Sequence, residues 1–372
     1  MRKARIGNVF VSLTQIYLMK RISLLSAFIC LMALTGCNKD DDSTNASTSA
    51  STCPQPFCGV APTIIDNGLN ITFLNHELAT PRAKYSVFFK VDDGFGPVTD
   101  LVIGDIEVKD NDQVIAFESE NELLPDPQSF GYHIVLVADL SESITESDDL
   151  PEVKEAMSAF VNSILNENNS EVGETFVSLY YFDGDPTLVQ LQDFTTNSEL
   201  LLHTIDNISA DLTRDNSTNL YGAFVSGAAI IKNRVTNSPK LIDVGAMVVF
   251  TDGEDFAGLQ TFEDAQNAVA DLEADENKID VYTIGAGETA DDQVLEALGY
   301  SGYFAAEDFD NLTPTFESIA TELNSEVNSY YKLEYCSPRR AGQTQISIKI
   351  TKGTSSGRIE SCINSDCTPD PC

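Results

Sequence analysis

The most constraining feature of this chain is a short apolar run that stops at an acidic residue. Five apolar residues, Ile134 to Ala138, precede Asp139, and the run is rich in valine and isoleucine. Such a run, bounded by polar residues, is typical of a strand buried on both faces of a sheet. Ser141 and Ser143 alternate with Asp139 just beyond the predicted strand. Because ligands of open α/β sheets bind at the carboxyl ends of the strands, this pattern places three oxygen-bearing side chains at one such edge.

Two later segments add side chains of the same kind. Thr218 stands at the beginning of a predicted amphipathic helix, and Asp252 follows a second predicted buried strand at 247–250. Hard oxygen atoms that converge on one point suit Mg²⁺, Mn²⁺ or Ca²⁺. The alternative is that the Asp-x-Ser-x-Ser stretch is only local turn chemistry.

The order of these residues resembles the metal-ion-dependent adhesion site of von Willebrand factor type A (VWA) domains. That site consists of Asp-x-Ser-x-Ser, a distant Thr and a distant Thr-Asp-Gly, and all five ligand positions match: Asp139, Ser141, Ser143, Thr218 and Asp252. The resemblance implies a divalent cation, with Mg²⁺ favoured over Mn²⁺ and Ca²⁺. It also implies a partner protein that completes the coordination with a carboxylate. The alternative is a structural metal that only ties loops together.

A second metal position is predicted at Asp148 and Asp149. Integrin β subunits have an Asp-Asp pair soon after their own motif that holds a second ion, and the pair here lies a residue or two further along. Acidic residues in the first turn of a helix also complement the helix dipole, and this is the alternative explanation.

Strands and helices alternate from residue 131 to about 330, which predicts a doubly wound, mostly parallel sheet of the VWA type. Short strands are predicted on either side, including one at 101–103, and we expect the two flanks to pair in one small β-sandwich. The domain boundaries that we expect are a signal peptide at 1–36, a tether at 37–60, a β-rich segment at 61–127, the VWA domain at 128–330, and C-terminal strands with a cysteine-rich tail at 331–372.

The N-terminus carries an export signal. A basic pair after Met19 precedes a short apolar stretch, and Leu-Thr-Gly-Cys ends at Cys37, a pattern that resembles the bacterial lipobox. The true start is Met1 or Met19. The acidic segment after Cys37 resembles the tag that directs some lipoproteins of the Bacteroidetes group to the outer face of the outer membrane. We therefore expect a lipid-anchored protein of the bacterial cell envelope whose only membrane contact is the anchor.

The charge and the cysteines restrict the partners and the compartment. The net charge of −36, from 22 basic and 58 acidic residues, excludes nucleic acid as a natural partner. Six cysteines remain after the signal and the lipid site, and an even number in an exported chain predicts disulfides. These candidates are Cys53, Cys58, Cys336, Cys362, Cys367 and Cys372.

Nothing in the sequence predicts an enzyme. The three histidines are scattered, and neither a Gly-x-Ser-x-Gly elbow nor a phosphate-binding glycine loop with lysine is present. The sequence instead indicates a surface-tethered adhesion or protein-binding lipoprotein that acts through its metal. The alternative is a structural or assembly component of an envelope complex, in which the metal only stabilises the fold.

Overall fold

The computed structural model describes residues 62–79, 84–115, 123, 130–165, 173–275, 279–287, 289–336 and 343–364. The predicted signal peptide, the lipidation site Cys37 and the tether lie outside these residues. Within the described part of the chain, no helix is long and apolar enough to cross a membrane.

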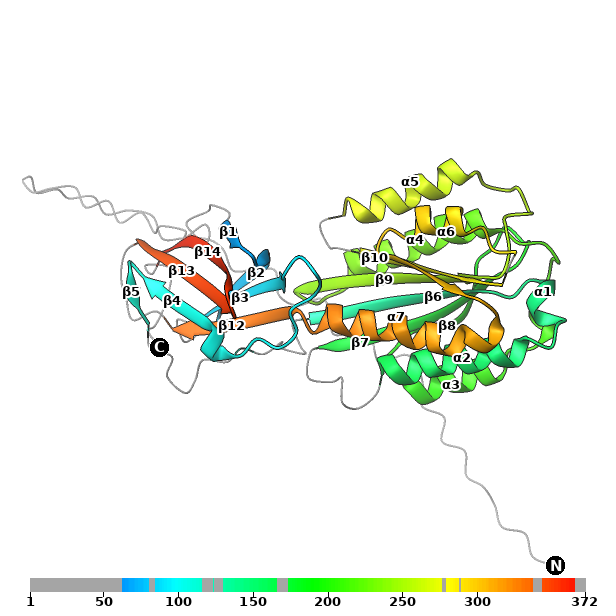
Figure 1. The fold of residues 1–372 in the computed structure, drawn as a ribbon, viewed down its shortest axis with the longest axis horizontal. Helices are drawn as coiled ribbons and strands as arrows, with labels where there is room; N and C mark the ends of the chain where they lie inside the picture. Colours follow the sequence, from blue (N-terminus) through cyan, green and yellow to red (C-terminus); the bar gives the residue numbers. More distant parts are fainter. Residues whose placement is uncertain are drawn as a thin grey trace, which may run out of the picture. The chain divides into compact units, whose positions relative to one another are not determined.

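A six-stranded sheet forms the larger part of the described fold (Figure 1). Its strand order is β11-β10-β9-β6-β7-β8, and all pairs are parallel except β7 with the edge strand β8. The strands are β6 (Phe130–Asp139), β7 (Glu174–Phe182), β8 (Val189–Thr195), β9 (Ile242–Thr251), β10 (Ile279–Ala286) and β11 (Gly302–Ala306). Every residue of β6 and β9 is buried, as their continuous apolar runs predict.

Helices cover both faces of this sheet (Figure 1). They are α1 (Glu142–Thr145), α2 (Leu150–Ile164), α3 (Ser198–Asp206), α4 (Leu220–Asn237), α5 (Phe262–Glu273), α6 (Asp292–Leu298) and α7 (Leu312–Val327). Helices α2, α3 and α7 share an apolar core with Ile134 and Leu136 of β6, whereas α4, α5 and α6 pack against Val135 and Val137. Successive side chains of a strand point to opposite faces, so one apolar run serves both cores. The predicted doubly wound fold is confirmed.

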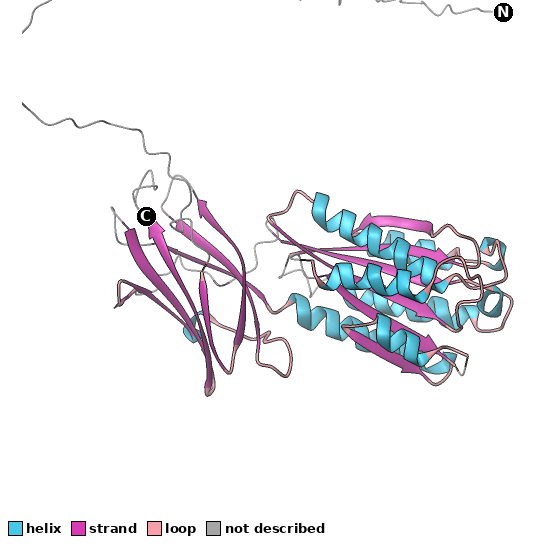
Figure 2. Ribbon diagram, turned by 90° about the horizontal axis from the view of Figure 1, so that it is seen from above, coloured by secondary structure: helices cyan, strands magenta, loops and turns pink. Residues whose placement is uncertain are grey.

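Two antiparallel sheets are built from the segments on either side of this region. One has the order β1-β14-β13-β4-β5 and the other β12-β3-β2. Their strands are β1 (Thr63–Asn67), β2 (Asn70–Ala79), β3 (Lys84–Asp92), β4 (Ile106–Asp110), β5 (Gln113–Val114), β12 (Tyr330–Cys336), β13 (Gln343–Lys352) and β14 (Ser355–Asn364). Strand β12 pairs with β3, β13 pairs with β4, and β14 pairs with β1, so each of these pairs joins the N-terminal flank to the C-terminal flank. The two flanks also share one apolar core, and strands dominate this part of the molecule in Figure 2.

The structure corrects the expected strand at 101–103. These residues form a loop and the start of a short 3-10 helix, Ile103–Asp105. The Asp105 carboxylate accepts the backbone N–H of Val102 at 3.0 Å, and the Tyr331 hydroxyl accepts that of Leu101 at 3.3 Å. Because side chains take up these backbone donors, the apolar triplet cannot join a β ladder there.

Among the predicted disulfide residues, Cys362 lies in β14 opposite Gln345 and is disulfide-bonded. Cys336 ends β12. The other four cysteines lie outside the described residues, and the pairing stays a prediction.

Candidate metal centre

Asp139 is the last residue of β6, and its side chain is completely buried. One carboxylate oxygen, Oδ1, accepts the backbone N–H of Ser141 at 2.9 Å. The other, Oδ2, accepts the hydroxyl of Thr251 at 2.6 Å, from the end of the neighbouring strand β9. Hydrogen bonds from two elements therefore fix the orientation of the Asp139 carboxylate.

Ser141 and Ser143 connect this carboxylate to Asp252. The two serine hydroxyl oxygens lie 3.1 Å apart, and the Ser143 hydroxyl donates to Oδ1 of Asp252 at 3.1 Å. Ser141 is the N-cap of α1 and Ser143 lies within its single turn, so both hydroxyls lie just beyond the end of β6. Four of the five predicted ligands thus form one group of oxygen atoms.

Thr218 belongs to a different loop, and its backbone ties that loop to the segment after Asp252. The Thr218 carbonyl accepts the backbone N–H groups of Phe256 and Ala257, each at 3.0 Å. A Cβ atom placed on Gly253 would lie 3.9 Å from the Thr218 hydroxyl oxygen, which locates this hydroxyl beside the end of β9. No hydrogen bond among the described residues joins the Thr218 hydroxyl to the other four side chains. The predicted amphipathic helix, α4, begins at Leu220, with Asn219 as its N-cap.

The electrostatics of the site favour a cation. Burial, followed by the nearby charge of Asp252, raises the pKa of Asp139 to about 7. Burial also raises the pKa of Asp252, although the hydrogen bond from Ser143 opposes the shift. Neither carboxylate has an ion-pair partner within the described parts of the chain. A divalent cation would relieve both the repulsion and the loss of solvation.

The donor set also fits the class of metal. Carboxylate and hydroxyl oxygens suit Mg²⁺, Mn²⁺ and Ca²⁺. The described residues contain no group of three or more histidine, cysteine, aspartate or glutamate side chains that could hold a metal. An ion at this site would be held by the carboxylates of Asp139 and Asp252 together with neutral hydroxyl groups.

Comparison with known proteins identifies the family. The sequence pattern of the von Willebrand factor type A domain family matches residues 133–318, which is half of the chain. The chain belongs to the VWA family. VWA domains often bind divalent cations and generally mediate binding between proteins.

Several solved structures resemble this VWA protein at low identity. BatB from Bacteroides thetaiotaomicron, described as a conserved hypothetical protein, covers 53% of this chain and 100% of its own at 16% identity, with a TM-score of 0.41. The VWA domain of the type V pili tip protein Mfa5 from Porphyromonas gingivalis covers 55% and 96% at 15% identity, with a TM-score of 0.41. Manganese-loaded TRAP protein from Plasmodium vivax covers 68% and 98% at 15% identity, with a TM-score of 0.40. No curated protein matches the chain.

The second predicted metal position lies at the start of α2 in the VWA domain. Asp149 is the N-cap of this helix, although its side chain makes no capping hydrogen bond to the described backbone of α2, and its charge contributes to the raised pKa of Asp252. Asp148 is exposed. Asp149 is therefore close enough to Asp252 for its charge to affect that carboxylate. A second ion at Asp148 and Asp149 stays a prediction.

Two residues that hold the predicted metal ligands in place were not expected from the sequence. Thr251 holds the Asp139 carboxylate, and the Thr-Asp-Gly motif that contains it was the available signal. Asp183 directly follows β7 and is almost fully buried. Its carboxylate accepts the backbone N–H groups of Arg214 at 2.6 Å and Asp185 at 2.8 Å, so it fixes the segment that leads to Thr218. An acidic residue at the end of a third strand was the signal for Asp183.

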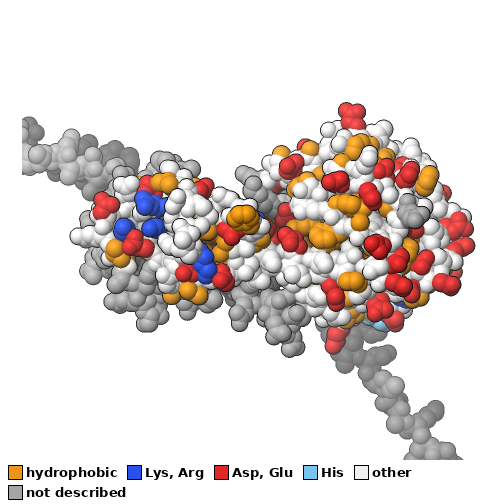
Figure 3. Space-filling view, viewed as in Figure 1, with side chains coloured by type: hydrophobic (Ala, Val, Ile, Leu, Met, Phe, Trp, Pro, Cys, Tyr) orange, Lys and Arg blue, Asp and Glu red, His pale blue; other side chains and the backbone are white. Residues whose placement is uncertain are grey.

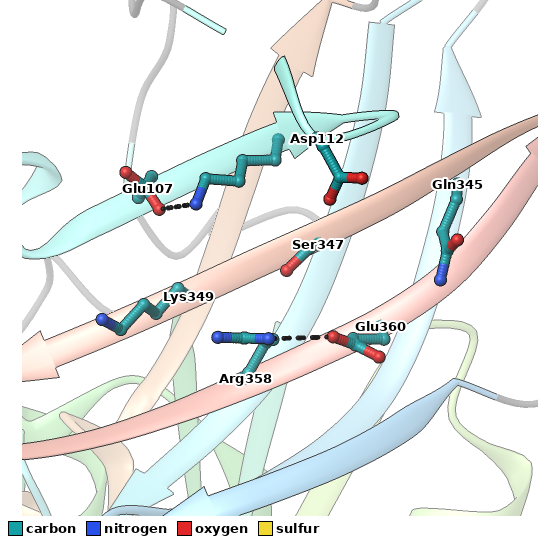
Figure 4. A pocket seen from close by; sticks show the side chains of 8 residues that line it. Glu107, Asp112, Gln345, Ser347, Lys349, Arg358 and Glu360 are labelled. Atoms are coloured by element: carbon teal, nitrogen blue, oxygen red, sulfur yellow. Dashed lines mark hydrogen bonds and ion pairs between the residues drawn. The ribbon is translucent and has the colours of Figure 1, made fainter. Parts of the chain in front are cut away.

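A polar hollow on the five-stranded antiparallel sheet is separate from the VWA site. Its volume is about 110 Å³, and it is lined by Glu107, Lys109, Asp112, Gln345, Ser347, Lys349, Arg358 and Glu360 (Figure 4). Lys109 pairs with Glu107 at 2.9 Å, and Arg358 pairs with Glu360 at 3.1 Å. Each pair joins residues two apart within one strand, β4 or β14, whose side chains point to the same face of the sheet, so both are ordinary for a solvated face. In Figure 3, lysine and arginine gather on this part of the molecule, whereas acidic side chains predominate on the VWA part.

Proposed function

We propose that this VWA protein is a metal-dependent protein-binding or adhesion protein. The observation that carries the proposal is the convergence of Asp139 and Asp252 on the hydroxyls of Ser141 and Ser143, without a cationic partner among the described residues. The ion that we propose there is Mg²⁺, with Mn²⁺ and Ca²⁺ as the alternatives.

The ligand chemistry explains why such a site would bind a partner. An ion held by two carboxylates and neutral hydroxyls keeps more effective positive charge than one surrounded by several carboxylates. That charge attracts an anionic group, and the carboxylate of an Asp or Glu side chain on a partner protein supplies one. The role is binding rather than catalysis.

We also propose that the protein is anchored to the cell envelope by a lipid on Cys37 and is exposed on the outer membrane. The lipobox-like segment and the acidic residues that follow it support this location. The segment at 37–60 would then hold the VWA domain away from the membrane.

A chelator experiment separates this function from that of a structural metal. The full chain is incubated with outer-membrane and extracellular fractions in Mg²⁺ or in excess chelator, and its melting is followed in parallel. For a binding protein, we expect the chelator to release partners at temperatures where the chain stays folded. Retention of every partner in chelator, together with a lower melting temperature, would indicate an envelope component stabilised by its metal.

A further inference from the structure

Two solvent-exposed apolar side chains lie in the loop between β9 and α5, just after Asp252. Phe256 is 71% exposed and Leu259 is 49% exposed. Single exposed apolar side chains are common on protein surfaces, so the location of these two carries the argument rather than their exposure alone. The position of this pair, a few residues from a proposed metal ligand, connects it to the site.

The loop that carries them is held firmly. The Asp255 carboxylate accepts the backbone N–H of Tyr221 at 3.1 Å and that of Gly258 at 3.0 Å. Gly258 has a φ of +62°, a conformation that favours glycine, so the turn is encoded in the sequence. Two backbone N–H groups of this loop also donate hydrogen bonds to the Thr218 carbonyl. Together, these hydrogen bonds fix the backbone on either side of Phe256. Flexibility of this loop therefore does not account for the exposure of Phe256.

The surroundings of the pair are strongly acidic. The loops at this edge of the sheet, at 140–149, 183–188, 213–219 and 252–261, contain many acidic residues and a single basic one, Arg214. A partner that brings a carboxylate to the metal must therefore approach through a negative field. Basic residues beside that carboxylate would offset the repulsion and favour encounter.

We propose that Phe256 and Leu259 form an apolar contact beside the metal, which selects a particular class of partner segment. That segment carries an acidic residue for the metal, an aromatic or large aliphatic residue beside it, and flanking lysine or arginine. This inference rests on the proposed function, because the metal supplies the primary contact. Phe256 and Leu259 determine specificity and do not touch the ion.

The probe is a library of random twelve-residue peptides displayed on phage. The full chain is loaded with Mn²⁺, exposed to the library, washed, and eluted with chelator. We expect the eluted peptides to share an acidic residue, an adjacent Phe, Tyr, Leu or Ile, and a net positive charge. Selected peptides are then synthesised, and their dissociation constants are measured against the wild-type chain and variants.

Three variants and a matched control complete the test. Phe256→Ser and Leu259→Ser should each lower the affinity for the selected peptides about ten-fold or more, as loss of a residue that anchors an interface does. The affinity for Mn²⁺ should stay unchanged. Phe95→Ser removes an aromatic side chain that is 99% exposed in the turn after β3, and it should change neither affinity. Arg214→Glu should further enrich basic peptides.

The outcomes distinguish the two proposals. If no peptide is eluted by chelator, the proposed function fails. If chelator elutes acidic peptides without an apolar neighbour, and Phe256→Ser binds them like the wild type, the function stands and this inference is wrong.

Discussion

At the scale of single residues, the two carboxylates of the proposed metal site are buried close to one another, which disfavours their ionised forms in the metal-free protein. Asp139 is buried close to Asp252, and its pKa is raised to about 7. Hydrogen bonds from Thr251 and Ser141 hold its two oxygen atoms in place. The residue is therefore oriented for a ligand role before any metal binds.

This arrangement predicts a specific pH dependence of stability without metal. The unfolded chain releases the Asp139 proton near pH 4, whereas the folded chain retains it until about pH 7. The free energy of unfolding should therefore fall as pH rises through this window. Asp139→Asn cannot ionise, so the fall should be smaller by an amount on the order of a few kcal/mol. Urea denaturation in chelator from pH 4 to pH 8 measures both, and parallel profiles would mean that Asp139 ionises freely in the folded state.

At the scale of elements, strands β6 and β9 carry polar groups at both ends. Near their carboxyl ends lie Asp139 and Thr251, at the proposed metal site. Nearer their amino ends, His133 Nε2 lies 2.6 Å from Oδ1 of Asp243, and Arg234 Nε donates to His133 Nδ1 at 3.1 Å. The Arg234 guanidinium also lies over two phenylalanine rings, Phe176 and Phe194. His133 and Asp243 are buried and Arg234 is half-buried, and this second group serves the packing of the sheet against α4.

The two ends should respond differently to substitution. Asp243→Ala leaves the buried His133 Nε2 without its acceptor and should lower the free energy of unfolding by about 1–3 kcal/mol. It should leave the affinity for Mn²⁺ unchanged, whereas Asp252→Ala should reduce that affinity strongly. Chemical denaturation and metal titration of the two variants make the comparison. A large loss of Mn²⁺ affinity in Asp243→Ala would show that the site depends on the whole length of the strands.

The sequence predicts those elements whose pattern is local. The apolar runs of β6 and β9 are confirmed as buried strands. Helix α6 was not predicted, because seven residues with two buried leucines are too short to display a helical period. Strand β14 was not predicted either, because Ser, Gly and Arg weaken its β signal and its pairing with β13 supplies the register.

The candidate site divides in the same way. Its five proposed ligands can be predicted from the sequence, because the motif fixes their order along the chain. The roles of Thr251 and Asp183 depend on which strands become neighbours and on where a distant loop returns. These contacts are tertiary, so composition and spacing do not reveal them.

At the scale of the whole molecule, segments on both sides of the VWA domain share sheets and a core. Because the β12–β3 pairing joins residues far apart in the chain, the VWA domain lies between two segments of one folded unit. Each flank supplies only part of that unit.

A fragment of residues 128–330 should fold without its flanks. Its sheet and both helical layers lie within this range, and it contains no cysteine, so reducing conditions should not matter. We expect a helix-rich circular dichroism spectrum and one cooperative melt. A fragment that stays unfolded until both flanks are restored would contradict this independence.

Attachment to the membrane should depend on one side chain. Cys37→Ser removes the proposed lipid site, and we expect the variant to leave the membrane fraction. Changing residues 39–42 to neutral ones tests surface exposure separately, by protease treatment of whole cells. Recovery of Cys37→Ser in washed membranes would reveal a different anchor.

The proposed metal site is tested most directly by calorimetric titration of the full chain with Mg²⁺ and Mn²⁺. The wild type is compared with Asp139→Ala, Thr218→Ala and the double variant. Each single substitution should weaken binding, and the double variant should lose little more than Asp139→Ala, because substitutions at one shared site are not additive. Added metal should raise the melting temperature of the wild type and leave the variants unmoved. Binding by Asp139→Ala with the affinity of the wild type would contradict the assignment and place the ion elsewhere.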